Sequence, residues 1–528
     1  MGKGKKIFSL MVVICIFLGL ISGCGAPEEE TLEEYENFLT PISQTMNDLN
    51  ADKVVTEPNF EIDKGVSESE TEFILSPIFS DNMLLQANMA VRIWGKCLTE
   101  GSIAVLVGEK PYFGTVLNGE FELFIGKTDY TKSTTLTIIN AKAKKTYSNV
   151  AFGELFLGTG QSNMGWTMNQ CEIYANEIAQ SANADIRLNK VLPAVADQPL
   201  NELEEKSTSG WSEATPSVVA NFGAVAYFFA KEINARYDVP VGILMSCMGG
   251  TTIVTWLDEQ AYTEADKTYS TDDPASEAYP NWTGTKRYNA MIHPIRKLTC
   301  RGALWYQGEN QPVNYEKNLR LLIDCWRRVF DNQSFYFAIV QLPRYEDAEK
   351  YFLVREQQKN VAVSTEYATY SCNIDCGMMA SEAEGKPQNP LGIHPFDKEP
   401  VGRRLAHAVM LDLYGAKGIY RGPELEKIRI KDGKVHITLK NCGTGLEIRG
   451  LGAGFEVAGE DGVFYDAKPE IVSPRTIALT CEEVKEVKTV RYGYSNESRF
   501  ILKLTKFGDC VSVYNKEGYP MEQFLAEI

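Results

Sequence analysis

The chain of 528 residues carries a formal net charge of -17 at pH 7, and 44% of its residues are hydrophobic and 23% charged. This composition is typical of a globular protein, and the length predicts two to four domains with a large core. The negative charge argues against a polyanionic partner, so we expect no nucleic acid to bind. A neutral polymer or a small substrate fits this charge better.

The N-terminus has the layout of a secretory signal, because three lysines precede an apolar stretch in "MGKGKKIFSLMVVICIFLGLISGC". This predicts a signal peptide over residues 1–24, which we exclude from the fold. Residues Ile21 to Cys24 resemble a bacterial lipobox, in which the chain is cut before the cysteine and the cysteine is acylated. We therefore expect an extracytoplasmic protein held at the bacterial cell membrane only by lipid on Cys24. A plain signal peptide and an uncleaved anchor helix are the alternatives.

Two segments follow the signal. Residues 25–70 are acidic and polar with few aromatic side chains, which predicts a flexible tether. Residues 71–150 contain short runs of β-branched and aromatic residues broken by Asn, Gly and Lys, which predicts a small antiparallel β domain. Within that domain, "LNGEF" at 117–121 predicts a hairpin turn.

The pattern changes over residues 151–417, where apolar strands alternate with helical stretches. The strands include "ELFLG", "VPVGILMSC", "RGALWY" and "FYFAIV", and the helices include "AVAYFFAKEINARY" and "EKNLRLLIDCWRRVFD". This alternation predicts a parallel α/β sheet, whose ligand lies beyond the carboxyl ends of the strands. Residues 418–528 return to short strands and predict a closing β domain. The predicted fold class is thus α/β with flanking β domains.

A serine stands among glycines directly after the first of these strands, in "GTGQSNMGWTM" at 158–168. Acyl transfer by serine needs a hydroxyl at a sharp turn, an imidazole to take its proton and donors for the oxyanion. Ser162 meets the first need, although Met164 stands where the Gly-x-Ser-x-Gly elbow of α/β hydrolases has its second glycine. Taken alone, a Gly-flanked serine is more often a turn residue.

A catalytic imidazole must come from four histidines. His394 stands in "NPLGIHPFDKEP", a loop that leads into an amphipathic helix, and this is a suitable place for a general base. His407 falls inside that helix and His436 on a C-terminal strand, so we interpret both as surface or core contacts. His293, in "YNAMIHPI", has the surroundings of a buried structural histidine.

Two further strand ends offer donors for an oxyanion. "MGGTT" contains Gly249 and Gly250, where adjacent glycines let a backbone N–H approach a substrate closely. "WYQGEN" contains Gln307, whose side chain has an amide donor. Together with the N–H of Ser162 these make a candidate oxyanion hole. Taken singly, the glycines fit tight turns and Gln307 fits a helix cap.

The cysteines show no metal-binding pattern. Cys372 and Cys376 are four residues apart, but no second cysteine pair or histidine cluster accompanies them. We therefore expect no zinc or other metal site and interpret these cysteines as buried small side chains. Export would permit disulfides, and the sequence alone does not pair them.

Four motifs in this order resemble the sialate O-acetylesterase family within the SGNH (GDSL-like) hydrolases, together with related acetylxylan esterases. They are "GQSNMGW", "MGGTTIVTW", "YNAMIHP" with "WYQGEN", and "IHPFDKEPVGRRLA". "SPIFSDNMLLQ" and "VRIWG" are similar to the leading β domain of that family, so the resemblance begins near Phe73. It implies an SGNH-type three-layer α/β/α domain over 151–417, flanked by β-sandwich-like domains at 71–150 and 418–528.

The resemblance also implies roles for single residues. Ser162 would be the nucleophile and His394 the general base, while the N–H of Ser162, Gly249 or Gly250 and Gln307 would form the oxyanion hole. The implied reaction is hydrolysis of an acetyl ester on a sugar, without a metal or organic cofactor.

One position departs from the family pattern. Many SGNH members carry an aspartate three residues before the histidine, and Leu391 stands there. The candidates for a third catalytic member are then Asp375, Glu309 and Asp397, or a backbone carbonyl that orients the imidazole.

The predicted function is removal of O-acetyl groups from a carbohydrate, with O-acetylated sialic acid preferred as substrate. An acetylxylan esterase is the alternative within enzymes. A catalytically inactive, glycan-binding lipoprotein is the alternative of another class, and the missing aspartate keeps it open. The oligomeric state is not predicted.

Overall fold

The computed structural model describes most of the chain after its N-terminal segment. The described residues are 50–267, 284–310, 314–345, 351–378, 380–385, 389, 392–450, 452–494 and 511–528. They all belong to one unit, Phe38–Ile528. The predicted signal peptide, the lipidation site Cys24, the tether as far as residue 49, and Leu391 lie outside the described residues.

The N-terminal part is built from short strands, and one three-residue 3-10 helix, η2 (Ala51–Lys53), precedes them. Strands β2 (Phe73–Leu75), β4 (Val91–Cys97) and β7 (Glu120–Ile125) form an antiparallel sheet. The other strands here join the large sheet described next: β1 (Ser67–Glu68), β3 (Leu84–Gln86), β5 (Gly101–Val107), β6 (Lys110–Val116) and β8 (Thr131–Asn140).

The predicted hairpin at "LNGEF" is confirmed. Leu117 and Glu120 exchange two backbone hydrogen bonds of 2.9 and 3.1 Å between β6 and β7. Asn118 and Gly119 between them have φ values of 56° and 75°. These are the two residue types that accept positive φ most readily, as a tight hairpin turn requires.

One long strand, β9 (Ala143–Gly160), belongs to both the N-terminal strands and the central sheet. Its first half pairs antiparallel with β8, and its second half pairs parallel with β12 (Val241–Cys247) and β13 (Gly302–Tyr306). The predicted division between residues 150 and 151 therefore falls inside a continuous strand. Residues of β9 from Val150 onward are all buried, which explains the unbroken apolar run in the sequence.

The central sheet has the order β11-β10-β12-β9-β13-β14-β15. All neighbours pair parallel except β10 and β11, which are antiparallel. The remaining strands are β10 (Asn183–Lys190), β11 (Ser212–Ala214), β14 (Tyr336–Val340) and β15 (Ala368–Ser371). The parallel strands end at one edge, as the alternating pattern predicted.

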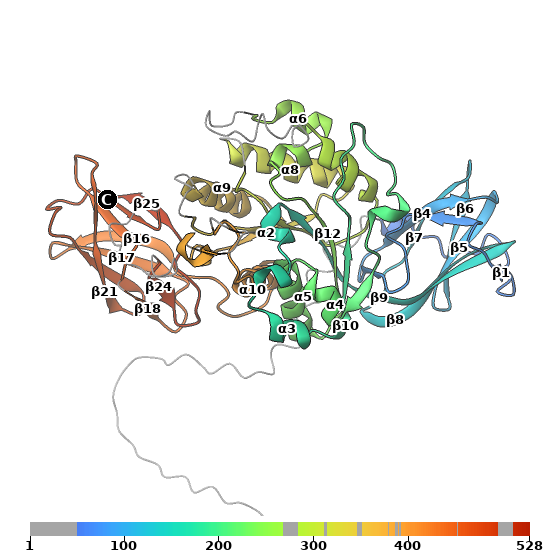
Figure 1. Ribbon diagram of the computed structural model, residues 1–528, viewed down its shortest axis with the longest axis horizontal. Coiled ribbons are helices and arrows are strands. Elements are labelled where there is room, and N and C mark those ends of the chain that lie inside the picture. The colour runs from blue at the N-terminus through green and yellow to red at the C-terminus, as the bar shows by residue number, and fades with distance from the viewer. Residues whose placement is uncertain are drawn as a thin grey trace, which may run out of the picture. The chain divides into compact units, whose positions relative to one another are not determined.

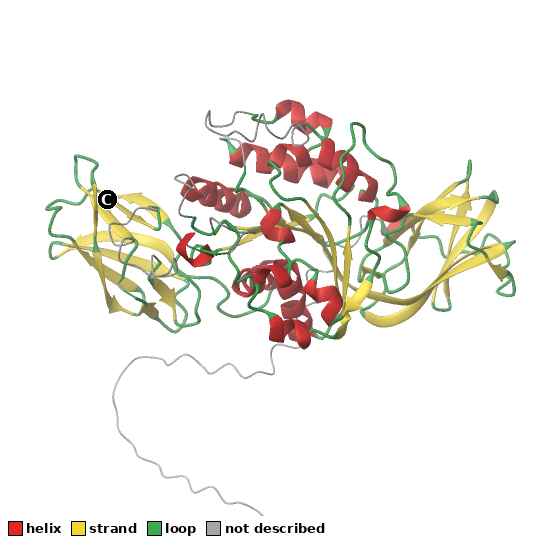
Figure 2. Ribbon diagram, viewed as in Figure 1, coloured by secondary structure: helices red, strands yellow, loops and turns green. Residues whose placement is uncertain are grey.

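Helices cover both faces of this sheet (Figure 1). On one face lie α5 (Ala224–Tyr237) and α10 (Glu399–Asp412), and on the other lie α8 (Tyr315–Val329) and α9 (Tyr351–Ser364). Figure 2 shows the same layers by secondary structure. The shorter α-helices are α2 (Ser162–Gly165), α3 (Ala175–Ala179), α4 (Pro216–Ala220) and α6 (Glu259–Glu264). Short 3-10 helices are η3 (Asn169–Cys171), η4 (Glu205–Ser207), η5 (Ile253–Trp256), η8 (His293–Ile295) and η9 (Ala380–Ala383), and η7 (Tyr288–Ile292) is a π-helix.

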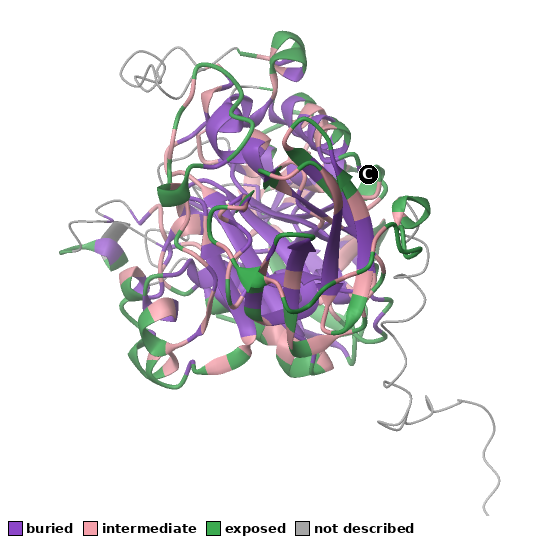
Figure 3. Ribbon diagram, turned by 90° about the vertical axis from the view of Figure 1, so that its right-hand side faces the viewer, coloured by how far each residue is buried: buried purple, intermediate pink, exposed green. Residues whose placement is uncertain are grey.

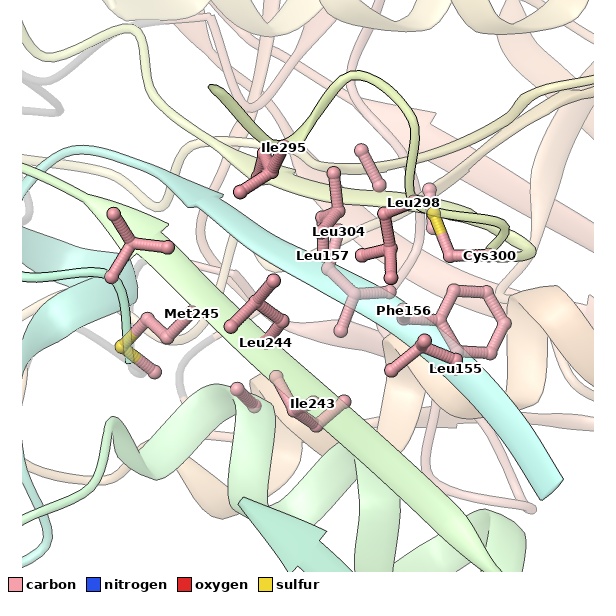
Figure 4. Close-up of a cluster of buried hydrophobic side chains, with 14 of the residues drawn as sticks. Leu155, Phe156, Leu157, Ile243, Leu244, Met245, Ile295, Leu298, Cys300 and Leu304 are labelled. Carbon is pink, nitrogen blue, oxygen red and sulfur yellow. The ribbon is translucent and has the colours of Figure 1, made fainter. Parts of the chain in front are cut away.

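The main core lies on both faces of the central strands (Figure 3). Figure 4 shows part of it, with Leu155, Phe156 and Leu157 of β9 beside side chains of β12 and β13. A strand packed on both faces buries every side chain, so its sequence reads as a continuous apolar run.

The C-terminal part has its own core, centred on residues such as Ile437, Val457 and Tyr492. One sheet has the order β16-β17-β22-β21, a second the order β20-β19-β23-β25, and β18 pairs with β24. Their bounds are β16 (Glu424–Lys431), β17 (Lys434–Lys440), β18 (Leu446–Ile448), β19 (Phe455–Ala458), β20 (Phe464–Asp466), β21 (Lys468–Ser473), β22 (Thr476–Thr480), β23 (Thr489–Tyr492), β24 (Val513–Asn515) and β25 (Phe524–Glu527). The predicted α/β class with additional β sheets is confirmed, while the exact domain boundaries stay predictions.

Candidate active site

Ser162 lies at the first position of α2, directly beyond the carboxyl end of β9. The turn between them depends on Gly160, whose φ is +124°. A Cβ on Gly160 would lie 2.1 Å from the backbone oxygen of Tyr306 on the neighbouring strand. The next residue, Gln161, donates its backbone N–H to that same oxygen at 3.0 Å. The sharp turn predicted from the glycine therefore fixes the serine at the ligand-binding edge of the sheet.

The structure brings Ser162 and His394 together, although 232 positions separate them. The distance from Ser162 Oγ to His394 Nε2 is 2.8 Å. His394 lies in the loop just before α10, as the sequence predicted. With its proton on Nδ1, a neutral imidazole accepts the serine hydroxyl proton at Nε2, which is the arrangement of a nucleophile and its base.

Two neighbours hold His394 in position. The indole ring of Trp166 stacks on the imidazole, with ring centroids 4.0 Å apart and an interplanar angle of 10°. The buried side chain of Asn389 accepts the backbone N–H of His394 at 3.0 Å and donates Nδ2 to its carbonyl oxygen at 2.8 Å. The buried Nδ1 of His394 has no hydrogen-bond partner among the described residues. The ring is thus held by stacking and by its backbone.

This environment disfavours the protonated imidazole. Burial, and then the positive charge of Lys398, lower the pKa of His394 to about 3. The imidazole is therefore neutral at neutral pH and available to accept a proton.

A buried polar network lies beside the Ser162–His394 pair. The Asn163 side chain donates Nδ2 to Glu309 Oε1 at 2.5 Å and to the backbone oxygen of Ile393 at 3.0 Å. Its Oδ1 accepts the ammonium of Lys398, which is fully buried. Burial lowers the pKa of Lys398 to about 8, and burial raises the pKa of Glu309. Asn163 thus ties the serine turn to the loop that carries His394.

Neither Asp375 nor Glu309 bonds to the imidazole. The Asp375 carboxylate pairs with Arg404 at 2.5 and 2.9 Å and accepts the Tyr514 hydroxyl at 3.2 Å. Glu309 Oε1 takes the Asn163 amide, and Oε2 is buried without a partner among the described residues. Asp397 accepts the hydroxyl of Tyr174 at 2.8 Å. In this geometry none of the three predicted carboxylates is the third member of a triad, because each is oriented by another group.

Of the predicted oxyanion donors, Ser162 and Gly249 lie together, whereas groups of Gly250 and Gln307 form hydrogen bonds within the protein. Gly249 lies beside the nucleophile, since a Cβ on it would be 3.3 Å from Ser162 Cβ. The backbone N–H groups of Ser162 and Gly249 donate to no acceptor within the described residues. Gly250 has a φ of +71°, and its carbonyl accepts the Asn310 amide at 2.7 Å.

Gln307, by contrast, is fully buried. Its Nε2 donates to Gln161 Oε1, Thr251 O and Asn310 O at 3.0, 3.2 and 2.6 Å. Both amide hydrogens therefore have internal acceptors, and Gln307 joins three loops instead of facing the oxyanion. The sequence interpretation of Gln307 as a donor is corrected on this point.

Comparison with known proteins matches part of this chain to an esterase family. Residues 153–375 match a family model described as carbohydrate esterase, sialic acid-specific acetylesterase. This segment, which is less than half of the chain, is similar to that family. The resemblance predicted from the four motifs is thereby confirmed.

Two curated sialate O-acetylesterases are among the proteins to which this chain is similar. The protein of Homo sapiens is 28% identical over 322 residues, covering 53% of this chain and 58% of the relative. The protein of Rattus norvegicus is 26% identical over 361 residues, covering 59% of this chain and 64% of the relative. The match thus spans less than two thirds of either relative.

A solved structure extends the similarity over most of the chain. A carbohydrate acetylesterase from Xanthomonas citri matches with a TM-score of 0.74 and 27% sequence identity. The match covers 86% of this chain and 99% of that chain. The similarity therefore includes flanking β sheets as well as residues 153–375.

A cavity of about 330 Å³ opens beside the nucleophile. Ser162 and Gly249 line it, and so does the indole of Trp166 that stacks on His394. Most of the remaining lining is apolar. A small acyl sugar therefore has room to place its ester carbonyl next to Ser162.

Sequence reasoning missed four residues of the candidate site: Asn163, Trp166, Asn389 and Lys398. Three of them stood inside motifs that the sequence had already singled out, in "GQSNMGW" and "IHPFDK". A pattern shows that such residues are near the site but not which atoms they face. Asn389 is the first residue of the quoted loop "NPLGIHPFDKEP", where its side chain had no assigned role.

The described residues contain no cluster of three or more His, Cys, Asp or Glu that could hold a metal ion. The described cysteines, Cys372 and Cys376 among them, are free thiols. Among the described helices, none has the length and hydropathy needed to cross a bilayer.

The structure also places two other histidines of the sequence analysis. His407 contacts Glu232 and Tyr519. His293 Nδ1 lies 2.9 Å from Leu200 O.

Proposed function

We propose that this chain is a carbohydrate O-acetylesterase that works through an acetyl-enzyme on Ser162. The observation that carries this proposal is the 2.8 Å contact between Ser162 Oγ and His394 Nε2 at the mouth of a cavity. The match of residues 153–375 to an acetylesterase family supports the choice of an acetyl ester on a sugar.

The acylation step follows from the positions of these groups. Ser162 Oγ attacks the acetyl carbonyl carbon while His394 Nε2 takes the hydroxyl proton. The carbonyl oxygen becomes an oxyanion, and the N–H groups of Ser162 and Gly249 stabilise it. When the intermediate collapses, the ester C–O bond breaks, and His394 returns the proton to the sugar oxygen that leaves.

Deacylation repeats the same chemistry with water. A water molecule loses a proton to His394 Nε2 and attacks the carbonyl carbon of the acetyl group on Ser162. The bond between that carbon and Ser162 Oγ then breaks, and His394 returns the proton to Oγ. The products are acetate and the free sugar hydroxyl. Throughout, the Trp166 ring and Asn389 keep the imidazole aligned with both oxygen atoms.

Substitution of the two central residues tests the mechanism. Ser162→Ala and His394→Ala should each lower kcat on p-nitrophenyl acetate by at least about a thousandfold, because nucleophile and base act as one unit. Ser473→Ala and His436→Ala, both in the C-terminal β sheets, are matched controls that should keep wild-type rates. Unchanged turnover in folded Ser162→Ala protein would overturn the proposal.

Sialic acid is the proposed sugar, because the matched family model and the curated relatives both carry that substrate in their descriptions. Acetylxylan is the alternative substrate. Acetate release from O-acetylated sialic acid and from acetylxylan separates the two, and hydrolysis of xylan alone would contradict the sialate assignment. Glycan binding without any ester hydrolysis by the wild-type chain would favour the inactive lipoprotein.

We also propose that the mature chain is attached to the outer face of a bacterial cell membrane through lipid on Cys24. The lipobox-like sequence before Cys24 supports this. Metabolic labelling with an alkyne fatty acid should mark the wild-type protein and not Cys24→Ser. Label that persists in the Cys24→Ser protein would contradict the proposal.

A further inference from the structure

The cavity beside Ser162 extends across the carboxyl ends of three neighbouring parallel strands. Ser162 follows β9, Met245 and Cys247 end β12, and Lys190 ends β10. In register, Lys190 lies opposite Met245, and Cys247 lies opposite Gly160. Lys190 is therefore level with Gly158, four positions before Ser162, and the two strands are about 10 Å apart sideways at an inter-strand spacing of about 4.8 Å.

Lys190 is the charged member of a lining that is otherwise neutral and largely apolar. The apolar lining includes Trp166, Val191, Leu192, Pro193, Met245 and Met248. The Lys190 ammonium donates to the backbone oxygen of Asn221 at 3.0 Å, and Asn221 also lines the cavity. Among the described residues it has no carboxylate partner, so two of its three N–H donors are available for a ligand.

The charge of Lys190 affects a second group on the cavity wall, the thiol of Cys247. Cys247 lines the same cavity, and burial raises the pKa of its thiol to about 12. The positive charge of Lys190 acts on that thiol in the opposite direction. The Lys190 ammonium and the Cys247 thiol are therefore close enough to interact, and both residues line this cavity.

We propose that Lys190 binds the carboxylate of an acidic sugar whose acetyl ester lies at Ser162. A sugar acid that carries its carboxylate and its ester at opposite ends spans the distance between the two groups. An ion pair in an apolar cavity is stronger than one in water, so the carboxylate sets the orientation of the sugar. This inference rests on the proposed esterase function and names the substrate as anionic.

Kinetics with matched substrates test the role of Lys190. Lys190→Met should raise KM for O-acetylated sialic acid by about tenfold to a hundredfold, the loss expected for a charge-assisted hydrogen bond. Its effect on the C1 methyl ester of the same sugar, which has no carboxylate, should be at least about tenfold smaller. Lys190→Arg should restore most of the affinity, and Lys206→Met, an exposed lysine outside the cavity, serves as the control.

Calorimetry with unacetylated sialic acid and Ser162→Ala protein separates binding from chemistry. Weaker binding of sialic acid to the Ser162→Ala/Lys190→Met protein than to the Ser162→Ala protein supports the inference even if the wild-type chain hydrolyses no acetyl ester. Equal binding to the two proteins overturns it. An equal loss on the acid and its methyl ester also overturns it, because it would reveal a structural role. Glucuronosyl-bearing acetylxylan compared with unbranched acetylxylan distinguishes a uronic acid from sialic acid as the source of the carboxylate.

Discussion

The indole ring of Trp166 lies almost parallel to the imidazole of His394, with centroids 4.0 Å apart. No described carboxylate reaches His394 Nδ1, so stacking takes over part of the orienting role that an acidic residue has in a triad. The indole also lines the cavity, which joins the orientation of the base to the substrate-binding surface.

Removal of this ring should slow catalysis. Trp166→Leu should lower kcat by about threefold to tenfold, because aromatic stacking contributes about 0.5–1.5 kcal/mol. Trp166→Phe keeps a flat ring and should retain most of the rate. The measurement is steady-state hydrolysis of p-nitrophenyl acetate, with circular dichroism to confirm folding. Identical rates in Trp166→Leu and wild type would show that stacking does not orient the base.

The Asn389 side chain should matter through the backbone of His394. Asn389→Ala removes two hydrogen bonds worth about 0.5–1.5 kcal/mol each, so kcat should fall by about tenfold to a hundredfold if both losses act on positioning. Asn389→Asp keeps the acceptor for the His394 N–H and should fall between wild type and alanine. A change in KM alone would contradict a positioning role.

The pH dependence should report the low pKa of His394. Since the base must be neutral, kcat/KM rises with pH through the His394 pKa of about 3. The acid limb of the pH–rate profile, where kcat/KM falls, should therefore lie well below pH 6.5. Near neutrality kcat/KM should not change with pH. Lys398→Met removes a positive charge that opposes protonation, so the acid limb should move to higher pH. Lys427→Met on the C-terminal sheet is the control, and a limb near 6.5 in wild type would contradict the assignment.

A buried ion pair should contribute strongly to the stability of the sheet. Glu154 on β9 is fully buried and holds Arg301 through two hydrogen bonds of 2.8 Å. Burial opposes ionisation, but the charge of Arg301 and its hydrogen bonds hold the pKa of Glu154 below its usual value. Glu154→Gln should lower the free energy of unfolding by about 3–5 kcal/mol, because it leaves a buried guanidinium without its partner.

The pH dependence of this pair has a definite sign. A carboxyl whose pKa is lower in the folded state contributes stability above its unfolded pKa and loses it as the pH falls through the folded value. Wild type should therefore lose more stability than Glu154→Gln on acidification below about pH 4.3, where a free Glu titrates. Parallel urea-unfolding curves for the two proteins across that range would contradict the prediction.

Gly160→Ala should disrupt the serine turn. Its φ of +124° is unfavourable for any residue with a Cβ, and that atom would lie 2.1 Å from the Tyr306 oxygen. We expect loss of activity together with a lower midpoint of thermal unfolding. Gly462→Ala, with a φ of +69° in open space, is a control for the backbone strain alone and should retain activity. Full activity in Gly160→Ala would show that the turn tolerates a shift.

The sequence by itself predicted the α/β class, because parallel strands buried on both faces have continuous apolar sequences and strand ends carry the polar loops. The pattern alone favoured a turn residue at Ser162, and the family resemblance predicted Ser162 as nucleophile and His394 as base. Local rules of this kind also gave the hairpin at "LNGEF", where Asn and Gly are needed for positive φ.

Only the tertiary structure decided what surrounds these two residues. The stacking of Trp166 on His394, the pairing of Asp375 with Arg404 and the hydrogen bond from Gln307 to Gln161 join positions far apart in the chain. A side chain's partner depends on which loops meet in space, and a linear pattern does not encode this meeting. The same reason left Lys190 unnoticed, because its distance from Ser162 follows from the strand order of the folded sheet.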